Sequence, residues 1–126
     1  MSLRTPLKNV RRLGSAKEGA DHFWQQRVTA VANVFLAIFL VWLVASLGGQ
    51  DHAAVKASLG NPLIAIGLLL LILSGVYHMR LGMQVVIEDY VHHEGWKIAC
   101  VLANTFFSAG IAIAGVYAIL KLGFGA

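Results

Sequence analysis

The sequence predicts an all-α membrane protein with three transmembrane helices. Of its 126 residues, 58% are hydrophobic and only 13% are charged, a composition far more apolar than that of a soluble domain. Three segments, residues 28–47, 63–82 and 98–122, are each long and apolar enough to cross a bilayer, which takes about 20 residues per helix. These spans leave no room for a soluble catalytic module. Because three helices make a thin bundle, we expect a second membrane subunit to pack against them.

The residues before the first span form a basic arm. Six of the ten Lys and Arg residues lie there: Arg4, Lys8, Arg11, Arg12, Lys17 and Arg27. Positive charge gathers on the cytoplasmic side of membrane proteins. We therefore expect residues 1–27 to be a cytoplasmic arm and residues 28–126 to be a transmembrane domain with a periplasmic C-terminus, in a bacterial inner membrane. The arm could lie on anionic lipid headgroups or dock on a partner protein. Because the positive charge is gathered on one side of the membrane, we do not interpret it as a nucleic-acid-binding surface.

Polar residues mark the start of the first span and the segment that follows it. Arg27 precedes the apolar core and has two interpretations, an anchor that snorkels to the interface or a cation that holds a buried anion. Asn33 lies deeper, where we expect it to form a hydrogen bond within the bundle. Residues 48–62 are predicted to be a short outer loop, which ends where Pro62 can begin the second helix at little cost.

His78 lies within the second span, where an ionisable side chain is costly and indicates a functional site by default. Gly75 and Gly82 lie about one turn either side of it on nearly the same face, so they leave a flat gap that would suit a planar macrocycle. His78 is either a neutral histidine hydrogen-bonded to a neighbouring helix or an axial ligand of a b-type haem. The other histidines lie outside the spans: His22, His52, His92 and His93. A haem with two histidine ligands would therefore need a second membrane subunit.

The second helix is expected to project beyond the membrane, because its apolar period continues through Ile87 before Asp89 and Tyr90. One interpretation of this pair is a helix-terminal acid beside an interfacial aromatic. The other is a site for a quinone head group, since a tyrosine hydroxyl can donate a hydrogen bond to a carbonyl and a carboxylate can relay protons. The spacing of Asp89 and Tyr90 from His78 fits both interpretations of the pair.

The third span follows a turn that contains His92 and His93, which we interpret as solvated side chains rather than metal ligands. Small residues then recur at a spacing that lets helices approach closely, although such spacing arises readily by chance in so apolar a segment. They are Ala99, Ala103, Gly110, Ala114 and Ala118.

One run of residues resembles a family signature. The run His78-x-x-x-Gly82-Met83-Gln84-x-x-x-x-Asp89-Tyr90 is similar to that of the small membrane-anchor D subunits of succinate dehydrogenase, respiratory complex II. The three-helix layout and the start of the first span at Arg27-Val28-Thr29-Ala30 are also similar, so the resemblance covers the chain past about residue 20. The other membrane anchor of that complex, the C type, has Arg-His where this chain has Gln84-Val85, which favours the D type.

The resemblance implies a role for each candidate residue. His78 would be an axial ligand to the iron of haem b, shared with the C-type anchor. Tyr90 would contact ubiquinone with Asp89 close by, and Arg27 would lie near the haem propionates. Many relatives have threonine at the position of Glu88, and an apolar or neutral residue at that of Arg80. These departures bear on the detail of the quinone site.

The resemblance also implies partners. Besides the C-type anchor, they are a flavoprotein that holds FAD and an iron–sulfur protein that holds the clusters, to which this chain would be a non-catalytic anchor. Electrons from succinate, an intermediate of the tricarboxylic acid cycle, would pass through these proteins to ubiquinone in the respiratory chain. The alternatives are the anchor of a quinol:fumarate reductase and a cofactor-free structural or assembly protein of the membrane. A small multidrug transporter is disfavoured, because the first span has no carboxylate to couple protons.

Overall fold

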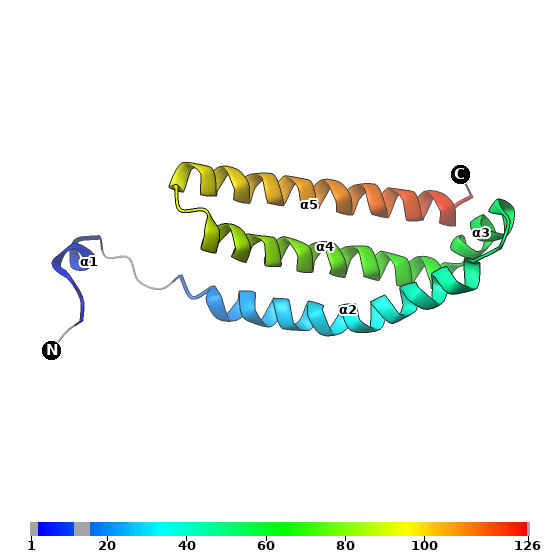
Figure 1. Cartoon of the computed structure of the whole chain (residues 1–126), viewed down its shortest axis with the longest axis horizontal. Coiled ribbons are helices and arrows are strands. Elements are labelled where there is room, and N and C mark those ends of the chain that lie inside the picture. The colour runs from blue at the N-terminus through cyan, green and yellow to red at the C-terminus, as the bar shows by residue number, and fades with distance from the viewer. Residues whose placement is uncertain (1–2, 12–15, 126) are drawn as a thin grey trace.

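The computed structural model describes residues 3–11 and 16–125, and every regular element within them is an α-helix. The helices are α1 (Pro6–Arg11), α2 (Gly19–Leu47), α3 (His52–Leu59), α4 (Pro62–Tyr90) and α5 (Glu94–Gly123), as Figure 1 shows. The predicted all-α fold is confirmed.

Three of these helices are long enough and apolar enough to cross a membrane. α2 and α4 have 29 residues each and α5 has 30, so each is about 44 Å long and exceeds the roughly 30 Å of a hydrocarbon core. The three predicted spans lie within them. α4 continues through Ile87, as predicted, and ends at Tyr90. α2 begins at Gly19, so the last part of the basic arm is already helical.

The segment between α2 and α4 corrects one prediction. Residues 48–62 were expected to be a loop, but they contain the eight-residue helix α3. Asp51 caps this helix, because its Oδ1 accepts a hydrogen bond of 2.9 Å from the Ala54 N–H. Asn61 caps α4 in the same way through the Leu63 N–H, and Pro62 occupies the first turn as predicted.

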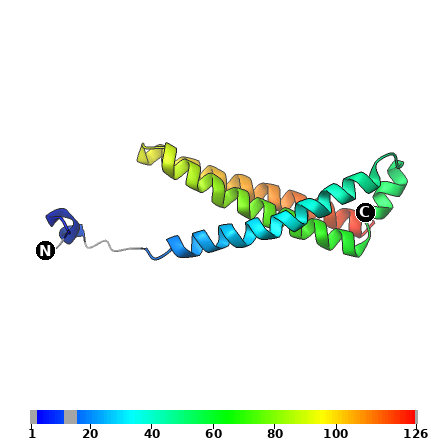
Figure 2. The ribbon, with the colours of Figure 1, turned by 60° about the horizontal axis from the view of Figure 1, so that its bottom comes forward.

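The three long helices form an open layer with α4 in the middle, packed against α2 on one side and α5 on the other (Figure 1). The start of α2, the end of α4 and the start of α5 lie at one end, whereas α3 and the C-terminus lie at the other. In Figure 2, α2 crosses the other two helices and diverges from them toward the end that holds its start. Polar side chains line the space between α2 and α4 at that end, as described below.

Close packing within the layer depends on two glycines. A Cβ at Gly67 of α4 would lie 2.8 Å from Cζ of Phe39 on α2, and a Cβ at Gly115 of α5 would lie 2.9 Å from Cγ2 of Ile72 on α4. Gly110, which belongs to the predicted small-residue pattern, faces open space instead. The pattern therefore indicated close packing of α5 but did not include Gly115, the glycine of α5 at which that packing occurs.

Most of the apolar surface is not covered by the chain itself. In each long helix, at most 6% of the most apolar window is buried within the structure. Large side chains such as Phe35, Phe106 and Ile113 are exposed. Soluble proteins rarely expose apolar patches of this extent, so these faces require lipid or another protein.

Candidate functional site

Polar side chains of α2 meet polar side chains of α4 along the line where the two helices pack. The Ser74 hydroxyl donates a hydrogen bond of 2.7 Å to Oδ1 of Asn33, which confirms the expectation that Asn33 bonds within the bundle. About one turn further along, Oγ1 of Thr29 lies 3.0 Å from Nδ1 of His78. A turn beyond that, on the adjoining side of α4, the Tyr77 hydroxyl donates a bond of 2.6 Å to Oε1 of Gln25. We call these three pairs the polar seam.

His78 lies in the middle of the polar seam and is partly buried. Its Nδ1 is held by Thr29, whose hydroxyl also lies 2.8 Å from the carbonyl oxygen of Gln25 and 3.2 Å from that of Gln26. Its Nε2 makes no hydrogen bond to any residue that the structure describes. His78 is thus hydrogen-bonded to a neighbouring helix and still has one ring nitrogen available for a ligand, so the two interpretations of this residue are compatible.

The two glycines near His78 have different surroundings. A Cβ at Gly75 would meet nothing within 4 Å, whereas a Cβ at Gly82 would lie 3.4 Å from Nε2 of Gln26 on α2. The predicted gap is therefore open beside Gly75, whereas beside Gly82 it adjoins the Gln26 side chain of α2.

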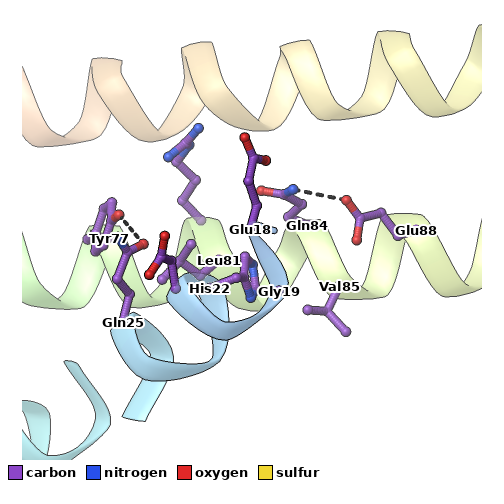
Figure 3. Close-up of a pocket in the computed structure, with 11 residues that line it drawn as sticks. Glu18, Gly19, His22, Gln25, Tyr77, Leu81, Gln84, Val85 and Glu88 are labelled. Carbon is purple, nitrogen blue, oxygen red and sulfur yellow. Dashed lines mark hydrogen bonds between the residues drawn. The ribbon is translucent and has the colours of Figure 1, made fainter. Parts of the chain in front are cut away.

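A polar cavity of about 630 Å³ lies between the first turns of α2 and the second half of α4 (Figure 3). Its ionisable lining residues are Glu18, Asp21, His22, Tyr77, Arg80 and Glu88. Gln84 donates a hydrogen bond of 2.9 Å to Oε1 of Glu88, and Nε2 of His22 is buried without a partner among the described residues. Arg80 and Glu88, the two departures from the family pattern, therefore line the same cavity.

Arg27 faces away from the polar seam. Its guanidinium carbon lies 4.4 Å from the ring centroid of Phe23, one turn earlier on α2, in a cation–π arrangement. Residues two positions apart do not share a helical face, so Arg27 and Thr29 point in different directions. The structure therefore does not bring Arg27 to His78 within this chain.

Asp89 and Tyr90 are the last two residues of α4. Both side chains are exposed, Tyr90 to 78%. They lie about 18 Å along the helix from His78, at the end where α2 begins and α5 starts. The next turn contains His93, whose Nδ1 caps α5 by accepting a bond of 3.4 Å from the Trp96 N–H, and His92 is exposed.

Sequence reasoning missed the contribution of Thr29 and of the pair formed by Gln25 and Tyr77. Thr29 and His78 are 49 residues apart, so their contact depends on the register between two helices. The available signal was the position of Thr29 within the run 27–30 that resembles the family.

The fold and the site define a class, a multi-pass membrane protein in which three apolar helices hold a histidine in a polar seam. Residues 1–118 match the family described as succinate dehydrogenase/fumarate reductase transmembrane subunit. The chain therefore belongs to the family of succinate dehydrogenase and fumarate reductase transmembrane subunits.

Similar curated proteins agree with this family. The chain is 31% identical over 120 residues to the succinate dehydrogenase hydrophobic membrane anchor subunit of Rickettsia bellii. This alignment covers 95% of this chain and 96% of that protein. It is 33% identical over 122 residues to the subunit of the same name in Paracoccus denitrificans. That alignment covers 97% of this chain and 94% of the Paracoccus protein. The predicted succinate dehydrogenase membrane anchor, a non-catalytic subunit, is confirmed.

Proposed function

We propose that this anchor subunit holds a b-type haem on His78, together with a second membrane subunit, and forms part of the site where ubiquinone is reduced. The observation that supports the haem most directly is the state of His78. One ring nitrogen is fixed by Thr29 and the other has no partner among the described residues, within a helix that crosses the membrane.

The residues present fit a haem. Iron in b-type haem takes an imidazole nitrogen, and metal-bound histidines hold their second ring nitrogen in a hydrogen bond, as Nδ1 of His78 does. The open space beside Gly75 leaves room on the same helical face. Bound there, haem would supply a one-electron redox centre inside the membrane. The second axial ligand would come from the partner anchor, because the remaining histidines of this chain lie outside the predicted spans.

Tyr90 and Asp89 are our candidates for the quinone end. The exposed Tyr90 hydroxyl can donate a hydrogen bond to a quinone carbonyl, and the Asp89 carboxylate can pass a proton from water toward it. A carboxylate at a helix C-terminus is disfavoured by about 0.3–1 kcal/mol, and the last turn of α4 contains no basic residue to offset this. The helix dipole therefore gives no stabilising reason for an acid at this position, which favours a functional one.

The arrangement of the helices also supports a topology. The basic arm precedes α2, so we propose that the end with the start of α2 faces the cytoplasm of a bacterium and that the C-terminus is periplasmic. Tyr90 then lies on the cytoplasmic side. The flavoprotein, which holds FAD, and the iron–sulfur protein, which holds the clusters, would dock on that side. Uncovered apolar faces of the layer fit a second anchor, of the C type. Relatives named for succinate dehydrogenase favour succinate oxidation over fumarate reduction as the working direction.

Haem content tests the proposal. The His78→Ala variant, purified with its partner subunits, should lose most of the haem per complex that the unaltered assembly contains. His52→Ala is the matched control, because His52 is an exposed histidine at the start of α3. Equal haem in the His78→Ala and unaltered complexes would contradict the proposed ligand.

A further inference from the structure

We propose that Thr29 is a positioning residue that fixes the tautomer of His78, so that Nε2 is the nitrogen that presents a lone pair. The inference rests on the proposed haem site and adds to it a residue of α2 that controls the ligand. The direction of the hydrogen bond between Thr29 and His78 follows from the carbonyl acceptors around the Thr29 hydroxyl.

A threonine hydroxyl has one proton to donate. Oγ1 of Thr29 lies 2.8 Å from the Gln25 carbonyl oxygen and 3.2 Å from that of Gln26. Carbonyl oxygens only accept hydrogen bonds, so a hydroxyl that gave its proton to the ring would leave its own lone pairs facing an oxygen at 2.8 Å. The proton therefore goes to the carbonyl. The bond of 3.0 Å between Thr29 and His78 then takes its proton from the ring.

This direction assigns the state of the imidazole. Neutral histidine has one N–H and one unprotonated nitrogen. Because Nδ1 donates to Thr29, Nε2 is the unprotonated nitrogen and can bind a metal without first losing a proton. The bond also holds the ring against rotation about its side-chain bonds.

The polar seam keeps Thr29 in register with His78. Hydrogen bonds between Asn33 and Ser74 on one side, and between Gln25 and Tyr77 on the other, link α2 to α4 about one turn from this pair. Gln25 contributes twice, since its backbone carbonyl accepts from Thr29 and its side chain accepts from Tyr77. A slide or rotation of α2 would break these bonds together.

A partner that accepts the second N–H makes a metal-bound imidazole more basic, and loss of such a partner weakens metal binding about 10–100-fold. A more basic ligand stabilises oxidised iron more than reduced iron, and hydrogen bonding around the site is one of the protein's controls on haem potential. Removal of the Thr29 hydroxyl should therefore raise the midpoint potential of the haem and accelerate its loss.

The test compares three variants in the complete complex purified with its partner subunits. Thr29→Val removes the hydroxyl and nearly keeps the shape, whereas Thr29→Ser keeps the hydroxyl. Thr105→Val is the matched control, because Thr105 of α5 also donates to a carbonyl one turn back, that of Val101, and bonds to no histidine among the described residues. Haem release is measured by absorbance after dilution of the complex. The midpoint potential is measured by absorbance during a redox titration.

We expect Thr29→Val to release haem about 10–100-fold more readily at a raised midpoint potential. Thr29→Ser and Thr105→Val should match the unaltered complex. An unchanged potential and haem retention in Thr29→Val, while His78→Ala loses haem, would overturn this inference and leave the proposed function standing. If Thr29→Val does not assemble, a shifted potential in Thr29→Ser would overturn it. An unaltered complex without haem would overturn both.

Discussion

The Ser74 hydroxyl on α4 donates a hydrogen bond of 2.7 Å to Oδ1 of Asn33 on α2, across 41 residues of sequence. Both residues lie within the predicted spans, where water does not compete for their polar groups. The bond ties the two helices together about one turn from the pair formed by Thr29 and His78. The position of His78 therefore depends on the packing of α2 as well as on its own helix.

A double-mutant cycle can measure this bond. We expect Asn33→Leu and Ser74→Ala each to lower the free energy of unfolding of the complex, with a coupling energy of about 0.6 kcal/mol and at most about 1.7 kcal/mol, as for other hydrogen bonds between membrane helices. Unfolding is followed by circular dichroism in mixed detergent micelles. Effects that simply add would show that the two side chains do not interact.

The open space beside Gly75 should be needed for haem rather than for folding. A leucine side chain at Gly75 would meet no neighbour within 4 Å of its Cβ, so we expect Gly75→Leu to leave helix content unchanged while it lowers haem per complex several-fold. Gly110→Leu is the matched control, since Gly110 also faces open space, on α5. Full haem content in Gly75→Leu would show that the macrocycle does not occupy this face.

Tyr90→Phe should slow succinate:quinone reductase activity about tenfold, because it removes one hydrogen-bond donor worth about 1–1.5 kcal/mol. Succinate oxidation with an artificial acceptor that bypasses the quinone should stay unchanged. Tyr117→Phe on α5 is the matched control, as Tyr117 is another exposed tyrosine of a membrane helix. A parallel fall of both activities in Tyr90→Phe would place its effect outside quinone reduction.

Asp89→Asn should change stability and activity in opposite directions. Removal of a carboxylate from the negative end of α4 should stabilise the helix by about 0.3–1 kcal/mol, whereas loss of a proton relay should lower quinone reduction about 10²–10⁴-fold. Glu94→Gln is the control, because Glu94 is an exposed carboxylate in the first turn of α5, which starts at the same end of the layer. Quinone reduction at the unaltered rate in Asp89→Asn would remove Asp89 from the proton path.

Composition and apolar length were sufficient to predict the three long helices, since a membrane span has few alternatives once about 20 apolar residues follow one another. The short helix α3 was missed because its eight residues have no apolar stripe long enough to detect, although Asp51 supplied a capping signal. Gly115 was missed as the close-packing glycine, because the helix faces that meet are set by the neighbour, in this case Ile72.

The candidate site was predictable in part for similar reasons. His78 stood out because an ionisable residue in a span is costly, and Asn33 because a polar group there needs a partner. Thr29 gave no such signal. Its hydroxyl can bond to its own helix backbone, so a threonine in a membrane helix is ordinary until the opposite helix places a histidine 3.0 Å away.

The most direct test of the central claim is an absorbance difference spectrum of the purified, unaltered assembly before and after succinate is added. If His78 holds a haem that receives electrons from succinate through the partner subunits, a b-type absorbance band should appear when succinate is added. No haem band, with succinate or with a strong chemical reductant, would contradict the claim, and His78 would then be a histidine that only links α4 to α2.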